Sequence, residues 1–197
     1  MEIFNPFDGA ILIWIQDNVR ADALDGVVKV ITHLGDKGIF WIALTLILLC
    51  FRKTRRIGVI CALSMLIGML ITNVAVKNVV ARPRPYREDM IQGLRLIIEE
   101  QSDWSFPSGH TTNSFAAAWV IFRRTTLGRT ARAGARFWGL MALILAILIS
   151  LSRLYVGVHY PTDIIGGVII GVFSAEVALA LWKLFYRRNR KLVKRLM

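Results

Sequence analysis

Three polar clusters interrupt the apolar segments of the chain, and their residue types suit phosphate chemistry. The clusters contain Lys77 with Arg84, then Ser108, Gly109 and His110, and then Arg153, His159 and Asp163. Lysine and arginine neutralise phosphate oxygens, and arginine can bind two of them at once. A serine and a glycine at the start of a helix expose backbone N–H groups, which favour an anion. The clusters therefore indicate a site for phosphoryl transfer.

The two histidines of these clusters can have distinct chemical roles. A histidine nitrogen can attack phosphorus while a carboxylate on the other ring nitrogen fixes the tautomer. His159 and Asp163 are four residues apart, and Pro161 suits the first turn of a helix, so both side chains share one face. His110 can then protonate the departing oxygen. With three cations, this set supports phosphomonoester hydrolysis without a metal or another cofactor.

Each cluster also has a structural interpretation when it is taken alone. Lys77 can anchor the end of a membrane helix, and the Arg-Pro-Arg-Pro stretch at 82–85 can end that helix. Ser108 can cap a helix, and His159 with Asp163 can form a structural hydrogen-bonded pair. The functional interpretation is favoured because all the clusters fall at the ends of apolar segments that would meet on one side of a membrane.

Long apolar segments lie on either side of these clusters. Hydrophobic residues make up 55% of the 197 residues, charged residues only 19%, and the mean hydropathy is +0.54. This composition argues against a water-soluble domain, a disordered chain and a collagen-like fibre. A membrane helix needs about 20 residues, and with their flanks five segments qualify: 38–51, 57–76, 111–122, 137–152 and 164–182. We expect an all-α, multi-span transmembrane helical bundle with five clear spans.

The N-terminal region is more polar than the segments that follow it. Charged residues interrupt its short apolar pieces, which predicts amphipathic helices at the membrane interface or a sixth, imperfect span. No cleavable signal peptide is expected. We therefore divide a single domain, residues 1–197, into an amphipathic region (1–35), a catalytic helical bundle (36–186) and a basic cytoplasmic tail (187–197).

The positive charges indicate how the bundle lies in the membrane. The chain has 25 lysines and arginines against 13 acidic residues, and 16 of the bases fall in three segments without an acid: 52–56, 123–136 and 183–197. Five spans place these segments on one side, which the positive-inside rule assigns to the cytoplasm. The net charge of +12 is then a topology signal that suits anionic membrane lipids rather than nucleic acid. The three polar clusters are expected on the extracytoplasmic side.

The order and spacing of the clusters resemble the three-part signature of the type 2 phosphatidic acid phosphatase family. The matching motifs are Lys77-x6-Arg84-Pro85, then Pro107-Ser108-Gly109-His110, and then Ser152-Arg153-x5-His159-x3-Asp163. The resemblance implies an α-helical membrane bundle that dephosphorylates lipids without a metal, through a phosphohistidine. It implies His159 as nucleophile, Asp163 as its partner and His110 as general acid. It also implies five phosphate ligands, which are Lys77, Arg84, Ser108, Gly109 and Arg153.

We therefore expect an integral lipid phosphatase of the cell membrane whose active site faces away from the cytoplasm. The favoured substrate is undecaprenyl diphosphate, because that carrier must be dephosphorylated on the outer face, and phosphatidic acid and phosphatidylglycerophosphate are the alternatives. A lipid or anion transporter is the competing non-enzymatic interpretation, and a haloperoxidase-like use of the site for vanadate is a third. Substrate selection is assigned to the loop 86–106, whose apolar stretch 90–98 suits a short helix. Arg82 lies outside the core signature and its role is open, whereas Glu176 is expected to hydrogen-bond a neighbouring helix.

Overall fold

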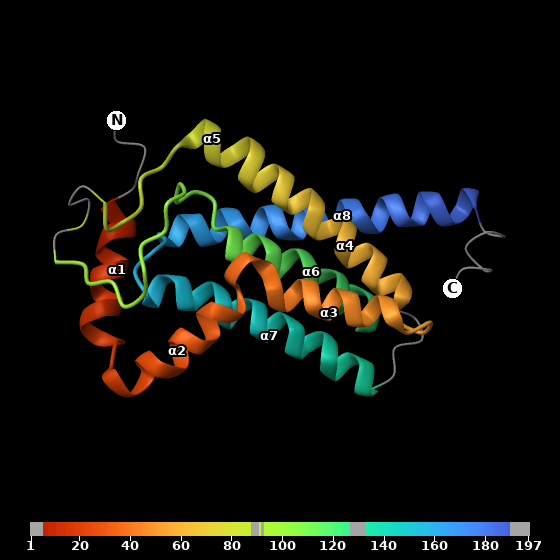
Figure 1. Cartoon of the computed structure of the whole chain (residues 1–197), viewed down its shortest axis with the longest axis horizontal. Coiled ribbons are helices and arrows are strands. Elements are labelled where there is room, and N and C mark those ends of the chain that lie inside the picture. Colours follow the sequence, from red (N-terminus) through yellow and green to blue (C-terminus); the bar gives the residue numbers. More distant parts are fainter. Residues whose placement is uncertain (1–5, 88–90, 92, 127–132, 190–197) are drawn as a thin grey trace.

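The structure is a computed structural model that describes residues 6–87, 91, 93–126 and 133–189. Within these ranges the chain forms helices and no strand, as the sequence predicts (Figure 1). The elements are α1 (Pro6–Asn18), α2 (Asp22–Leu34), the 3-10 helix η1 (Asp36–Gly38), α3 (Ile39–Cys50), α4 (Arg55–Met69), the π-helix η2 (Leu70–Val76), α5 (Lys77–Val80), α6 (Gly109–Thr125), α7 (Ala133–Tyr155) and α8 (Pro161–Arg188).

Helix α6 is the central helix of the bundle and contacts α4, α7 and α8. Its middle consists of small residues, and Ala116, Ala117 and Ala118 are buried. Small side chains allow neighbouring helices to approach closely. A Cβ atom at Gly171 of α8 would lie 2.7 Å from the carbonyl oxygen of Thr112 in α6. Any larger residue at Gly171 would therefore push α8 away from α6.

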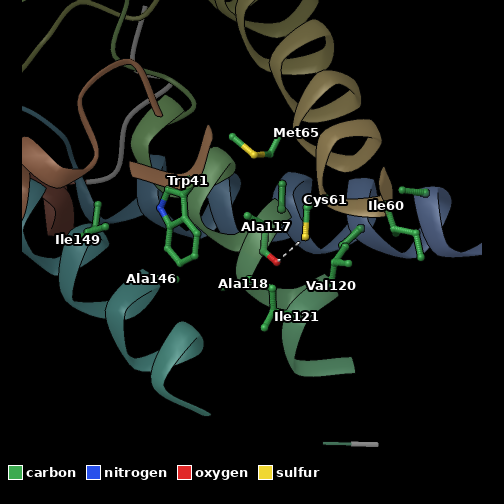
Figure 2. Close-up of a cluster of buried hydrophobic side chains, with 13 residues drawn as sticks. Trp41, Ile60, Cys61, Met65, Ala117, Ala118, Val120, Ile121, Ala146 and Ile149 are labelled. Carbon is green, nitrogen blue, oxygen red and sulfur yellow. Dashed lines mark hydrogen bonds between the residues drawn. The ribbon is translucent and has the colours of Figure 1, made fainter. Parts of the chain in front are cut away.

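The apolar core joins α3 and α4 to this central helix. Figure 2 shows Trp41, Ile60 and Cys61 among the buried side chains that surround α6. Trp41 of α3 donates its indole N–H to Oγ of Ser114 at 2.8 Å. In α4, Oγ of Ser64 donates to the carbonyl oxygen of Ala116, also at 2.8 Å. These two hydrogen bonds satisfy buried polar groups and join α3 and α4 to α6. They therefore help to fix the arrangement of these helices.

The candidate membrane spans are fewer than the sequence predicts. Three segments are long and apolar enough to cross a membrane, namely Arg55–Val80, α7 and α8. A fourth span results if α2 and the segment Asp36–Cys50, which meet at a bend of 46°, cross together. The prediction of five clear spans is therefore not confirmed. The difference arises because α3 has only 12 residues and α6 has 17, and 17 residues at ~1.5 Å each reach only about 25 Å.

The segment between α5 and α6 lies over the end of the bundle where α7 ends and α8 begins (Figure 1). The side chain of Gln16 in α1 hydrogen-bonds the backbone of this segment at two points. The helix predicted over 90–98 is wrong for the described part of that stretch, which forms turns and bends. Its apolar side chains divide between two clusters, one around Leu12 and one around Val156, so an irregular path buries them better than one helical face would.

The described parts of the three basic segments gather at the opposite end of the bundle. Four of these bases line one cavity of about 470 Å³ with Trp182 and Tyr186, and they are Arg56, Arg123, Arg124 and Lys183. Glu176 of α8 accepts a hydrogen bond from the indole of Trp119 at 2.7 Å, so its predicted contact with a neighbouring helix is confirmed. The remaining predicted basic residues within 127–132 and 190–197 lie outside the described residues. Which end faces the cytoplasm stays a prediction.

Candidate active site

A cavity of about 240 Å³ lies where η2 meets α5 and where α6 begins. Its lining includes five of the eight residues that the sequence predicts for the site, namely Lys77, Arg84, Gly109, His110 and His159. Asp163 lies directly behind the lining, in contact with His159, and Ser108 immediately precedes Gly109 in the chain. Arg153 is not in the described lining. It is buried in α7 and donates its Nη1–H to Oγ1 of Thr32 at 2.6 Å.

His159 lies in the turn before α8, and its two ring nitrogens have different partners. Nδ1 lies 3.2 Å from Oδ2 of Asp163, whereas Nε2 lies 3.4 Å from Nη1 of Arg84. Burial, followed by the charges of Arg84 and Arg153, holds the pKa of His159 well below its usual range. The ring is therefore neutral at pH 7. The carboxylate fixes the proton on Nδ1, which leaves the lone pair on Nε2.

The start of α8 fixes the carboxylate of Asp163. Tyr160 precedes the helix with an extended backbone, and Pro161 occupies the first helical position. Oδ2 of Asp163 accepts the backbone N–H of Tyr160 at 2.9 Å and the hydroxyl of Ser105. Asp163 is fully buried, so these bonds replace the water that a carboxylate would otherwise require. Ser105 is a partner that the sequence reasoning missed.

Helix α6 begins at the cavity with Ser108 as its N-cap. Oγ of Ser108 accepts the backbone N–H of Thr111 at 3.4 Å, and the N–H of Ser108 donates to the carbonyl oxygen of Asp163 at 3.1 Å. Ser108 is thus occupied as a cap, and the free N–H groups of the first turn come from Gly109 and His110, which line the cavity. These groups and the helix dipole favour an anion.

The bend between α2 and α3 brings a carboxylate to His110. Nε2 of His110 lies 2.9 Å from Oδ1 of Asp36, which belongs to η1. This approach requires Gly35, because a Cβ atom there would lie 2.5 Å from Cδ2 of His110. Asp36 also pairs with His33, at 2.7 Å. The predicted general acid His110 therefore has a carboxylate partner, Asp36, that is too distant in the sequence to be predicted from it.

Asp103 lies between two of the predicted phosphate-binding cations. Its Oδ1 accepts Nη2–H of Arg84 at 2.6 Å, and its Oδ2 contacts Nζ of Lys77. Arg84 also donates Nε–H to the carbonyl oxygen of Asp103 and Nη1–H to that of Val158, each at 2.9 Å. Lys77 is buried at the junction of η2 and α5. Both cations therefore face one small volume, which a carboxylate occupies.

Asp103 is the most consequential residue that the sequence reasoning missed. Its side chain is 53% exposed. Burial raises its pKa, but the hydrogen bonds and charges of Lys77 and Arg84 outweigh burial and hold the pKa below its usual range. Charge balance is the signal that could have found it, because buried cations require a counter-charge. Asp103 is the acid that lies nearest before Ser108 in the sequence.

The arrangement as a whole can bind a phosphoryl group, attack it and protonate a leaving group. Lys77, Arg84 and the start of α6 supply positive charge, while His159 and His110 supply a nucleophile and a proton donor. Within the described ranges, no group of three or more histidine, cysteine or acidic side chains could hold a metal ion.

Comparisons with known proteins show which proteins the chain resembles. The chain is 33% identical over 158 residues to an undecaprenyl-diphosphatase of Sulfolobus acidocaldarius, which covers 80% of this chain and 70% of that protein. It is 29% identical over 142 residues to a decaprenylphosphoryl-5-phosphoribose phosphatase of Mycobacterium tuberculosis, which covers 72% of this chain and 71% of that protein. Both relatives are named as phosphatases of lipids.

Two solved structures and a family model complete the comparison. The fold matches LpxE of Aquifex aeolicus with a TM-score of 0.71 and 24% identity, over 91% of this chain and 98% of that one. It matches a phosphatidylglycerolphosphate phosphatase of Bacillus subtilis with a TM-score of 0.69 and 25% identity, over 89% of this chain and 84% of that one. The family model of the PAP2 superfamily matches residues 57–190, a range that contains all eight predicted site residues. The chain therefore belongs to the PAP2 superfamily and is a lipid phosphatase of that family.

Proposed function

We propose that this lipid phosphatase removes the terminal phosphate of undecaprenyl diphosphate through a phosphohistidine on His159. The orientation of His159 carries the proposal, because Nδ1 faces Asp163 while Nε2 lies beside Arg84 at the cavity. A ring held in this way presents its lone pair to a bound phosphoryl group. The similarity to the undecaprenyl-diphosphatase of Sulfolobus acidocaldarius supports the choice of substrate.

In the first step, phosphate oxygens displace the carboxylate of Asp103 from Lys77 and Arg84. Nε2 of His159 attacks the terminal phosphorus, and the bond from phosphorus to the bridging oxygen breaks. His110 donates a proton to that oxygen, so undecaprenyl phosphate leaves. The imidazole ring of the phosphohistidine carries a positive charge, and its Nδ1–H remains bound to Asp163. The positive groups around the phosphate stabilise the negative charge that develops on its oxygens.

In the second step, a water molecule attacks the phosphorus of the phosphohistidine. The bond from phosphorus to Nε2 breaks, and His110, now neutral, accepts a proton from the water. His159 returns to its neutral form, and inorganic phosphate is released. Burial lowers the pKa of His110 to about 4, and Asp36, which contacts His110, offsets part of this effect. Asp36 thus favours the protonated form that donates in the first step and is restored in the second. The cycle closes when Asp103 pairs again with the two cations.

An apolar groove offers a path for the lipid chain of the substrate. The groove has a volume of about 290 Å³ and lies between α3 and α4, where its lining includes Leu46 and Leu66. It shares Lys37 and Asn113 with the lining of the polar cavity. A phosphorylated lipid can therefore lie with its headgroup in the cavity and the first part of its chain between these helices.

Other substrates and a transport function make different demands on the structure. Phosphatidylglycerophosphate is the second candidate, because the phosphatidylglycerolphosphate phosphatase of Bacillus subtilis has the same fold at 25% identity. A transporter needs charged groups through the depth of the membrane. Among the described residues, the buried charged side chains instead gather around the cavity or directly behind it, and they are Asp8, Lys77, Arg82, Arg84, Arg153 and Asp163. This distribution favours an enzyme.

Phosphate release from a panel of lipids tests the proposal. The purified protein in detergent is given undecaprenyl diphosphate, phosphatidic acid or phosphatidylglycerophosphate with EDTA present, and His159→Ala serves as the matched control. We expect the highest kcat/KM on undecaprenyl diphosphate and no turnover by the variant. A higher kcat/KM on phosphatidylglycerophosphate moves the assignment to the second candidate. No release from any lipid contradicts the proposed function.

A further inference from the structure

Arg82 is a buried arginine that takes no part in the reaction as proposed. It is 1% exposed and contacts Asp163 at Oδ1, the oxygen that His159 does not use. Its Nη1–H donates to this oxygen at 2.6 Å, and its Nη2–H donates to Oδ2 of Asp8 at 2.7 Å. The guanidinium also lies 3.6 Å from the centre of the Tyr160 ring. Arg82 is thus held by two carboxylates and an aromatic face.

Asp8 brings the N-terminal helix α1 into this cluster. Its side chain is buried and accepts hydrogen bonds from the backbone N–H and the hydroxyl of Thr162, at 3.2 and 2.5 Å. Asp8 lies outside residues 57–190, the range that the PAP2 superfamily model matches. A residue outside the matched range therefore completes a series of polar contacts that runs from Asp8 through Arg82 and Asp163 to His159.

We propose that Arg82 and Asp8 are positioning residues that hold Asp163, and through it His159, in the orientation for attack on phosphorus. The inference rests on the proposed phosphohistidine mechanism. Asp163 can fix the imidazole only if its own carboxylate does not rotate. Oδ2 binds the backbone of Tyr160 and Nδ1 of His159, while Arg82 occupies Oδ1. Asp163 is fully buried, so rotation of the carboxylate would break the bond to Arg82 without a gain in hydration.

Asp8 has an electrostatic role in addition to this geometric one. Phosphorylation places a positive charge on the imidazole ring of His159, which Asp163 stabilises. Arg82 alone would neutralise Asp163 and remove this stabilisation. Asp8 offsets the charge of Arg82, so the cluster of Asp8, Arg82 and Asp163 keeps a net charge of about −1 for His159, and burial strengthens the attraction.

Single-turnover kinetics of three variants test the proposal, namely Arg82→Gln, Arg82→Lys and Asp8→Asn. Asp17→Asn on α1 and Arg136→Gln on α7 change the same charges at exposed positions and serve as controls. We expect Arg82→Gln to slow phosphorylation of His159 by about 10–100-fold, the range typical of groups that orient a functional histidine. Arg82→Lys keeps the charge and should restore part of the rate. The inhibition constant of inorganic phosphate should not change, because Lys77 and Arg84 are intact.

Two further readouts separate positioning from a general loss of structure. The rate loss should be equal on undecaprenyl diphosphate and on p-nitrophenyl phosphate, because attack is impaired rather than protonation of the leaving group. The double variant Asp8→Asn with Arg82→Gln should be no slower than Arg82→Gln alone, since Asp8 acts through Arg82. If Arg82→Gln does not fold, Asp8→Asn alone carries the comparison, with a smaller loss in the same rate.

The outcomes distinguish this inference from the proposed function. If the wild-type protein releases no phosphate from any substrate, the proposed function fails. If the wild type is active but Asp8→Asn and the folded Arg82 variants keep its phosphorylation rate, the positioning role is overturned. Equal losses in the rate and in phosphate binding would show that the whole site has collapsed, which also overturns it.

Discussion

Replacement of Asp103 by asparagine should strengthen phosphate binding and weaken the free protein. In the free structure the carboxylate pairs with Lys77 and Arg84, which are the cations that the reaction needs for phosphate. A phosphoryl group must therefore displace Asp103 before it binds. Asp103→Asn removes the competing charge and retains the size of the side chain.

The size of the effect follows from the exposure of Asp103. A charge-assisted hydrogen bond contributes about 1.5–3 kcal/mol when it is buried, whereas exposed ion pairs contribute at most about 1 kcal/mol. Because the side chain of Asp103 is 53% exposed, we apply the lower figure to each pair. Two pairs then give at most about 2 kcal/mol, or a decrease of up to roughly 30-fold in the inhibition constant of phosphate. The same loss should lower the Tm of the free protein by a few degrees.

The assay compares inhibition by inorganic phosphate with thermal unfolding for the wild type, Asp103→Asn and Glu100→Gln. Glu100 is an exposed acid on the same segment, so its variant makes the same change in charge away from the cavity. We expect tighter inhibition and a lower Tm in Asp103→Asn alone. Weaker inhibition by phosphate in Asp103→Asn would refute the reasoning, because it would show that Asp103 helps to bind the substrate.

Three further predictions concern topology, metal and pH. Single-cysteine labelling with an impermeant reagent should reach residues 81–108 from outside the cell and residues 52–56 only after the membrane is opened, and the reverse pattern would overturn the orientation. Activity should persist in excess EDTA and be blocked by vanadate, because Lys77 and Arg84 supply the positive charge, whereas loss in EDTA and recovery with Mg²⁺ would refute this role. The pKa of His159 in the folded protein lies well below its unfolded value. Below about pH 6.5 the unfolded chain therefore binds more protons than the folded protein, so the Tm should fall as the pH is lowered from 7.5 to 5.5. His159→Gln should reduce this slope, and an unchanged slope would show that His159 titrates normally.

The sequence predicted the contact between His159 and Asp163 and the helix start at Ser108 because their spacing reflects local helix geometry. The four-residue separation of His159 and Asp163 and the helix start at Ser108 both depend on neighbours in the chain. The acids that complete the site have no such spacing. Asp36, Asp103 and Asp8 reach it from a bend, an irregular segment and an N-terminal helix, so only the folded chain reveals them.

The count of five spans is not confirmed, for a different physical reason. Hydropathy detects apolar segments, but it does not show whether a helix faces lipid or other helices. In α6, Ala116 and Ala118 are fully buried against neighbouring helices, and the helix is only 17 residues long. Helices α1 and α2 form in the N-terminal region, where the sequence predicts amphipathic helices or a sixth, imperfect span. Helix α2 qualifies as part of a bent span only together with the segment Asp36–Cys50.

Trapping of the phosphoenzyme tests the central claim most directly. The wild type, His159→Ala and His110→Ala are mixed with undecaprenyl diphosphate labelled in its terminal phosphate, and acid-labile phosphoprotein is measured in a single turnover. We predict the adduct in the wild type, its absence in His159→Ala, and its slower formation in His110→Ala by about 10²–10⁴-fold, because only the general acid is lost. An adduct in His159→Ala that is missing from His110→Ala would contradict the account and reverse the two roles.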